Sequence, residues 1–162
     1  MNIEVRQYTN EDLPEMRIIW NEIVREGNAY PQEEYLDEED ARHFFAEQSY
    51  TGVAVDSGNV VGLYILHPNN VGRCGHIANA SYAVKSGQRG KRIGESLVVD
   101  SMRVASLLSF RLLQFNAVVA SNERAIRLYK KLGFTRLGTI EGGFRMDNGQ
   151  YVDIIPFYKK LI

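Results

Sequence analysis

The spacing of apolar residues changes along the chain, and each spacing predicts a different kind of element. In three segments, apolar positions recur every three or four residues, as on one face of an α-helix: 9–26, 93–108 and 122–132. Shorter runs rich in β-branched and aromatic residues, which are typical of strands, occupy 3–8, 76–84, 112–119, 134–141 and 151–158. Strands and helices therefore alternate over much of the chain.

Turn residues join two further runs into a hairpin. The segments 53–55 and 60–66 are apolar, and the intervening Asp56-Ser57-Gly58-Asn59 has the composition of a tight turn. By contrast, a helix separates the strands at 76–84 and 112–119, and such a strand–helix–strand crossover places its two strands parallel. This part of the chain therefore predicts one parallel pair beside an antiparallel meander.

The expected fold class is α/β, with one mixed, mostly antiparallel sheet flanked by helices. With 162 residues, of which 44% are hydrophobic, the chain can bury one sizeable core but hardly two, so we expect a single domain over 1–162. Thr9 and Asp12 form a variant of the capping box before the first helix. The acidic segment 33–40 leads into a short helix that bears Phe44 and Phe45.

Charge and cysteine content exclude several functions. The net charge is −1 and the cations are not spread in a long stripe, so we expect no nucleic-acid partner. The single cysteine, Cys74, cannot form an intramolecular disulfide and offers no cluster for zinc, so we expect no metal. No apolar run reaches membrane-spanning length, and the first residues lack the features of a signal peptide. We therefore expect no membrane partner and a cytoplasmic location.

The segment 88–94, Gln-Arg-Gly-Lys-Arg-Ile-Gly, carries two glycines and three cations between an expected strand and an expected helix. The unpaired N–H groups and the positive dipole end at a helix start suit a phosphate or pyrophosphate. The glycine spacing does not fit the dinucleotide pattern G-x-G-x-x-G, and no Ser or Thr follows Lys91 as in a P-loop. A solvated basic turn that caps the helix is the alternative to an anion site.

With Arg89 in the first place and Gly94 in the last, this loop resembles the acetyl-CoA pyrophosphate loop of the GNAT superfamily of N-acetyltransferases, although Arg92 stands where a glycine is usual. The segment 122–134 resembles the family's other recurring block, Asn-x-x-Ala-x-x-Leu-Tyr-x-x-x-Gly-Phe, without a gap. The two segments occur in the family's order and at its spacing. The resemblance implies a GNAT fold, in which two parallel strands splay apart and acetyl-CoA, the acetyl donor, occupies the opening.

The resemblance also assigns roles to individual residues. Backbone N–H groups at 82–84, where the family's strand bulges, would hold the oxyanion and pair with the pantetheine amides of the cofactor. Asn122 would contact the cofactor near its reactive end, cap its own helix, or do both. Arg92 would offer its backbone N–H to the pyrophosphate while its side chain points outward. The cofactor-binding residues implied are Tyr82, Ala83, Val84, Arg89, Gly90, Lys91, Arg92, Ile93, Gly94 and Asn122.

For the chemistry, the resemblance makes Tyr129 the group that protonates the departing CoA thiolate after direct attack by an amine. A phenol with a pKa near 10 suits that task, although an aromatic residue on a helical apolar face can also be part of the core. The spacing does not single out a general base. The residues able to accept a proton are Glu26, His67, His76, Glu141 and Asp153.

Two asparagines and an arginine are candidates for acceptor binding. Asn79 and Asn116 are polar positions within apolar strands, and buried amides need partners, which a small substrate or internal strand ends would supply. The segments 75–80, 115–116 and 149–153 partly resemble a GNAT subgroup that includes fungal acetyltransferases acting on proline-like amino acids. If the acceptor carries a carboxylate, Arg145 would bind it; the alternative is an arginine in a solvated loop.

Three functions follow from these observations. The leading expectation is an N-acetyltransferase that acts on the amine of a small molecule. The alternatives are a protein or peptide N-acetyltransferase and a noncatalytic module that binds acyl-CoA, for which Arg92 in place of the usual glycine is the main argument. Because many members of the family dimerise, the resemblance also implies a homodimer.

Overall fold

The computed structural model describes residues 2–162 and contains four α-helices within that range. The helices are α1 (Leu13–Glu26), α2 (Glu38–Ala46), α3 (Ile93–Leu107) and α4 (Glu123–Lys131), with short 3-10 helices at Asn10–Asp12 and Gly72–Cys74. The strands are β1 (Ile3–Gln7), β2 (Tyr50–Asp56), β3 (Asn59–Pro68), β4 (Ile77–Val84), β5 (Leu112–Val119), β6 (Thr135–Arg136), β7 (Ile140–Arg145) and β8 (Tyr151–Lys160). Among these residues, no helix combines the length and apolar character needed to cross a membrane.

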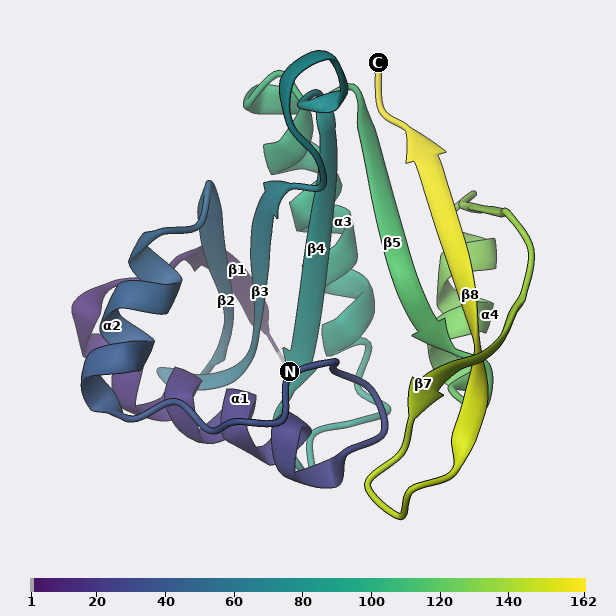
Figure 1. Ribbon diagram of the computed structural model, residues 1–162. Helices are drawn as coiled ribbons and strands as arrows, with labels where there is room; N and C mark the ends of the chain where they lie inside the picture. The colour runs from purple at the N-terminus through teal and green to yellow at the C-terminus, as the bar shows by residue number, and fades with distance from the viewer. Residues whose placement is uncertain (1) are drawn as a thin grey trace.

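All eight strands form one sheet in the order β1-β2-β3-β4-β5-β8-β6, with β7 also paired to β8. The β4–β5 pair is parallel and the other pairs are antiparallel, which confirms the predicted mixed sheet of the α/β class. Figure 1 shows α1 and α2 on one face of this sheet and α3 and α4 on the other. The sheet is therefore the middle of three layers.

Strand β3 illustrates how the sheet supports two cores. Because neighbouring side chains of a strand point to opposite faces, Leu63 and Ile65 pack in the cluster that includes α1 and α2. Tyr64 and Leu66 pack in the cluster that includes α3. Nearly the whole strand is buried, so it reads as a continuous apolar run rather than an alternating one.

The parallel strands β4 and β5 separate soon after they begin. They pair at Ile77↔Leu112, Ala78↔Leu113 and Asn79↔Gln114, and the pairing stops there although β4 continues to Val84 and β5 to Val119. The register between β5 and β8 also shifts between Phe115 and Val118. The predicted splay is thus confirmed, and it lies at the carboxyl ends of the two strands.

Two predicted elements differ from the structure. The α-helix expected from residue 9 begins at Leu13, because Thr9 to Asp12 form a 3-10 turn in which the Thr9 N–H donates to Asp12 Oδ2 over 2.7 Å. The single strand expected over 134–141 is divided into β6 and β7. Gly138 has a φ of 151° between them, a conformation that interrupts a strand.

Candidate active site

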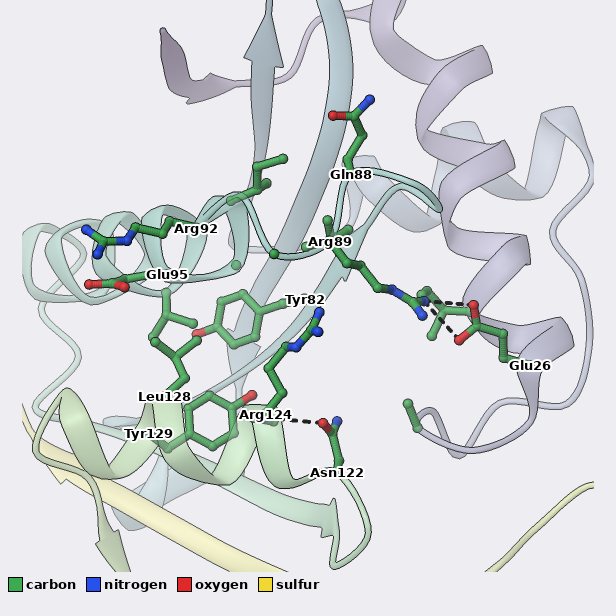
Figure 2. A pocket seen from close by; sticks show the side chains of 18 of the residues that line it. Glu26, Tyr82, Gln88, Arg89, Arg92, Glu95, Asn122, Arg124, Leu128 and Tyr129 are labelled. Carbon is green, nitrogen blue, oxygen red and sulfur yellow. Dashed lines mark hydrogen bonds and ion pairs between the residues drawn. The ribbon is translucent and has the colours of Figure 1, made fainter. Parts of the chain in front are cut away.

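A cavity of about 800 Å³ lies between the loop that joins β4 to α3, the first turn of α3, the helix α4 and the end of α1. Figure 2 shows side chains from all of these elements around one space, among them Arg89, Glu95, Tyr129 and Glu26. We call it the larger cavity. Of the ten predicted cofactor-binding residues, eight line it: Tyr82, Val84, Arg89, Gly90, Arg92, Ile93, Gly94 and Asn122.

The β4–α3 loop owes its shape to three residues with positive φ. These are Gly87 at 80°, Gly90 at 85° and Arg92 at 60°, which is the N-cap of α3. The left-handed conformation costs an L-residue about 1–2 kcal/mol but costs glycine little. Arg92, which stands where the resemblance predicts a glycine, therefore has a backbone conformation that glycine adopts more easily, at a cost in stability.

Two residues of this loop, Ser86 and Arg89, are tied to α1 rather than directed at the helix start. Arg89 donates to both carboxylate oxygens of Glu26, at 2.7 and 2.9 Å, and Figure 2 shows this pair at one edge of the larger cavity. The Ser86 N–H donates to Glu22 over 3.2 Å. Lys91 donates to Gln88 over 2.7 Å and does not line the cavity. The backbone N–H groups at the start of α3 and the Arg92 side chain, which lines the cavity, remain as anion-binding features.

Strand β4 presents alternate backbone groups to the opening. The Lys85 N–H donates to the Val61 carbonyl of β3, and amides alternate between the two neighbours of a strand. The N–H groups of Tyr82 and Val84 therefore face away from β3, toward the side where β5 has separated. Ala83 has the opposite parity: its backbone faces Leu63 of β3 and its side chain is buried in the core beside α1.

The expected bulge in β4 is not present in this ladder. The β3–β4 register is continuous from Pro68↔Ala78 to Gly62↔Val84, so a bulge at 82–84 is wrong. The amides of Tyr82 and Val84 are free of β3 by alternation alone. The splay of β5, and not a distortion of β4, leaves them without a strand partner.

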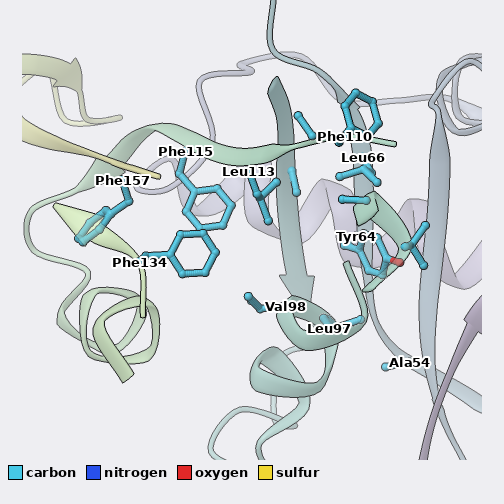
Figure 3. Close-up of a cluster of buried hydrophobic side chains, with 14 of the residues drawn as sticks. Ala54, Tyr64, Leu66, Leu97, Val98, Phe110, Leu113, Phe115, Phe134 and Phe157 are labelled. Carbon is cyan, nitrogen blue, oxygen red and sulfur yellow. The ribbon is translucent and has the colours of Figure 1, made fainter. Parts of the chain in front are cut away.

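Tyr129 joins the larger cavity to an aromatic cluster. Its ring centroid lies 4.4 Å from that of Phe115 and 5.6 Å from that of Phe134, and Figure 3 shows these two phenylalanines beside Phe157. In Figure 2 the Tyr129 hydroxyl is directed into the cavity. Within residues 2–162 this hydroxyl has no hydrogen-bond partner, and burial raises the pKa of Tyr129 well above its usual value near 10. The group is thus a protonated phenol with an uncommitted O–H.

Asn122 and Arg124 flank the start of α4. The Asn122 Oδ1 accepts the Ala125 N–H over 3.2 Å, so the predicted helix cap is confirmed, and the residue also lines the larger cavity. Arg124 lines this cavity as well. Sequence reasoning missed Arg124, because it occupies a variable position of the 122–134 block. Lys131 of α4 donates to both oxygens of Glu95 of α3 at 2.9 Å, which ties the two helices together beside the cavity.

A smaller cavity of about 200 Å³ continues into the splay between β4 and β5. Asn79 and Asn116 both line it. The Asn79 amide donates to the Gln114 carbonyl over 3.0 Å, and the Asn116 amide donates to Asn69 over 2.7 Å, so each asparagine also has an internal partner. The residues that line both cavities are Ala29, Tyr82, Asn122, Ala125 and Tyr129.

The remaining candidates lie elsewhere. Arg145 forms an ion pair with Glu33 and lines neither cavity. Four of the candidate bases also line neither cavity: His67, His76, Glu141 and Asp153. Glu26 lines the larger cavity, but Arg89 holds its carboxylate. Among the described residues, no group of three or more His, Cys, Asp or Glu side chains could hold a metal ion.

Comparison with known proteins agrees with this geometry. The family model described as "Acetyltransferase (GNAT) family" matches residues 10–134. The N-acetyltransferase aca1 of Schizosaccharomyces pombe is 30% identical over 82% of this chain and 72% of its own length.

Solved structures give the same result. A GCN5-related N-acetyltransferase from Kribbella flavida is 34% identical, with a TM-score of 0.90 over 98% of this chain and 97% of that one. A phosphinothricin acetyltransferase from Sinorhizobium meliloti, solved in complex with acetyl-CoA, is 22% identical, with a TM-score of 0.90 over 99% of this chain and 89% of that one. With its splayed β4–β5 pair, its helix-capping loop and these matches, the chain belongs to the GNAT family of acetyltransferases.

Proposed function

We propose that this protein transfers the acetyl group of acetyl-CoA to the amine of a small molecule. The observation that carries the proposal is the meeting of two cavities at a shared wall that includes Tyr82 of β4 and Tyr129 of α4. A donor in the larger cavity and an acceptor in the smaller one would meet there. Tyr82 and Tyr129 line both spaces, so both would contact the reacting atoms.

The larger cavity fits the donor by its volume and by its backbone groups. About 800 Å³ lies within the range of about 300–1,000 Å³ for ligand pockets. The N–H groups at the start of α3 suit a pyrophosphate, and a Cβ added at Gly90 would meet nothing, so glycine is required there for its φ of 85° rather than for space. The acetyl-CoA complex of the Sinorhizobium meliloti enzyme supports the same donor.

Different residues of the chain would carry out different steps of the reaction. The amine nitrogen forms a bond to the thioester carbon, and the N–H groups of Tyr82 and Val84 donate to the oxyanion that develops. When the carbon–sulfur bond breaks, Tyr129 gives its phenolic proton to the thiolate. The proton lost from nitrogen leaves to solvent. The raised pKa keeps Tyr129 protonated throughout the neutral range and also makes it a weaker acid than a phenol of ordinary pKa. After the transfer, the Tyr129 phenolate takes a proton back from solvent.

The smaller cavity supports a small acceptor. Its volume is about 200 Å³, and within residues 2–162 the side chains that line it are apolar, aromatic, hydroxyl or amide groups with no carboxylate, imidazole or cation. A carboxylate general base is therefore not built into its wall, and the acceptor enters as a neutral amine. Asn79 and Asn116 would bind its other polar groups. The limited volume favours a small molecule over a folded protein.

A thiol-release screen tests this proposal. The protein is incubated with acetyl-CoA and with amino acids, amino-acid amides, polyamines, aminoglycosides and a peptide library, and free CoA is measured. We expect thiol release with one class of small amine, and mass spectrometry then identifies an N-acetyl product. Release with peptides alone would contradict the small-molecule acceptor. Tight acetyl-CoA binding without release for any amine would contradict catalysis.

A further inference from the structure

The segment between α1 and α2, residues 27–37, forms one side of the smaller cavity. Ala29, Tyr30 and Pro31 line the cavity from this segment. The segment is held at both ends: the Asp147 N–H donates to the Gly27 carbonyl over 3.3 Å, and the Asn21 side chain makes two hydrogen bonds of 2.9 Å with the Leu36 backbone. Tyr30 is therefore presented to the cavity from an anchored segment.

Tyr30 is buried, and its hydroxyl has a defined partner. The side chain is 9% exposed, and its ring centroid lies 4.6 Å from that of Trp20 on α1. Its hydroxyl donates to the Tyr82 carbonyl over 2.6 Å. This carbonyl faces the opening for the same reason as the Tyr82 N–H, because β4 alternates its backbone groups between β3 and the side of β5.

A phenol has one proton to donate and two lone pairs to accept with. Since the Tyr30 proton is committed to the Tyr82 carbonyl, the oxygen of Tyr30 can only accept a further hydrogen bond. Burial also raises the pKa of Tyr30 well above its usual value near 10, so the group stays a phenol and does not become a base. Toward the smaller cavity, Tyr30 is a fixed hydrogen-bond acceptor.

We propose that Tyr30 orients the acceptor by accepting one N–H of the attacking amine. This inference rests on the proposed function. The hydroxyl is bonded to the same residue, Tyr82, whose N–H is assigned to the oxyanion, so an amine held by Tyr30 lies beside the carbon that it attacks. With one N–H bonded, the nitrogen lone pair is free to point at the thioester. Positioning of this kind removes part of the entropic barrier to reaction.

The variant Tyr30→Phe tests the contact, because it removes the hydroxyl and keeps the ring against Trp20. Tyr35→Phe is the matched control: Tyr35 belongs to the same segment, is 57% exposed and lines neither cavity. We expect Tyr30→Phe to lower kcat/KM for the best amine of the screen about tenfold, as for the loss of a hydrogen bond to a developing charge. The acetyl-CoA Kd, measured by calorimetry, should stay within about twofold of wild type. The midpoint of the rise in activity with pH should be the same in the variant and in wild type.

Four results would overturn the inference. An unchanged kcat/KM in Tyr30→Phe means that the amine does not use this hydroxyl. A loss of acetyl-CoA affinity as large as the loss of kcat/KM means that the bond only braces β4, and tighter acetyl-CoA binding means that Tyr30 competes with the donor for the Tyr82 carbonyl. A wild-type protein that acetylates no amine contradicts the proposed function instead. In that case, the binding of the panel amines is compared between wild type and Tyr30→Phe, both loaded with CoA. Equal binding to the two proteins also overturns the role of Tyr30.

Discussion

The larger and the smaller cavity share a wall but are constructed differently. In the larger cavity, the part that suits an anion is a short contiguous loop with the first turn of the helix that follows it, although α1 and α4 also line the cavity. The smaller cavity is lined by side chains from four distant segments: 29–31, β4, β5 and α4 with its N-cap. A contiguous backbone site needs a conserved conformation, whereas an assembled site can change its ligand by changing single side chains.

The largest expected effect concerns the wall that the cavities share. Tyr129→Phe should lower kcat about 10²–10⁴-fold, the usual range for loss of a general acid, while the acetyl-CoA Kd changes less than about twofold. Because burial raises the pKa of Tyr129, the wild-type rate should not fall through ionisation of this group as the pH rises to about 10. Steady-state kinetics and calorimetry measure both quantities. Full activity of Tyr129→Phe would remove it as the proton donor.

The backbone character of the larger cavity can be tested with glycines. Gly90 and Gly149 both have a φ of 85° and open space where a Cβ would lie, but Gly149 is in the β7–β8 turn and lines neither cavity. Replacing either by Ala should destabilise the fold by about 1 kcal/mol. Gly90→Ala alone should also weaken acetyl-CoA binding about fivefold, the equivalent of one backbone hydrogen bond. Equal donor affinity in the two variants would contradict a backbone site.

The side-chain character of the smaller cavity predicts the opposite pattern. Asn79→Ala and Asn116→Ala should each raise the acceptor KM about fivefold, since each removes one amide contact, and should leave the acetyl-CoA Kd unchanged. Asn79 is partly buried and bonded to Gln114, so its variant should also lower the free energy of unfolding by about 1 kcal/mol. The exposed Asn59 of the β2–β3 hairpin provides a control. Unchanged acceptor kinetics in both variants would remove these residues from the acceptor site.

The smallest effect on activity is expected far from both cavities, at the start of α1. Arg6 donates to the buried Asp12 over 2.8 and 3.0 Å, and this hydrogen bond lowers the pKa of Asp12 below its ordinary value. The bond therefore stabilises the fold at pH values above the ordinary pKa of an aspartate. This stabilisation is lost as the pH falls through the lowered pKa of Asp12. Asp12→Asn should cost about 1 kcal/mol at pH 7 and little at pH about 2. Urea unfolding at the two pH values measures this, and activity at pH 7 should be unaffected.

The comparison also explains which parts of the structure the sequence could predict. The hairpin of β2 and β3, the helices α3 and α4 and the strand β5 lie within three residues of their predicted ranges. Each depends on a local pattern of apolar spacing, turn residues or caps. The prediction of a single strand over 134–141 was wrong, because the chain is divided at Gly138. An isolated glycine within a strand pattern does not indicate whether the strand continues.

The candidate site also has residues that the local sequence predicts and residues that it does not. Most of the predicted cofactor-binding residues line the larger cavity because the loop and the first turn of α3 are contiguous in sequence. Ala83 does not, since the parity of β4 turns it toward α1, and Lys91 does not, since its side chain bonds Gln88. Tyr30 was missed altogether. A tyrosine before a proline in a polar loop carries no sign of a partner that lies 52 positions away.

By itself, the sequence determined the family, the order of the elements and the anion-binding loop, because these depend on residues close together along the chain. The tertiary structure decided the pairings across the site: Tyr30 with Tyr82, Arg89 with Glu26 over 63 positions, and Arg145 with Glu33 over 112 positions. It also decided that the amides of Tyr82 and Val84 have no strand partner, since that depends on where β5 separates from β4. Such contacts depend on how distant segments pack, and local spacing does not encode their geometry.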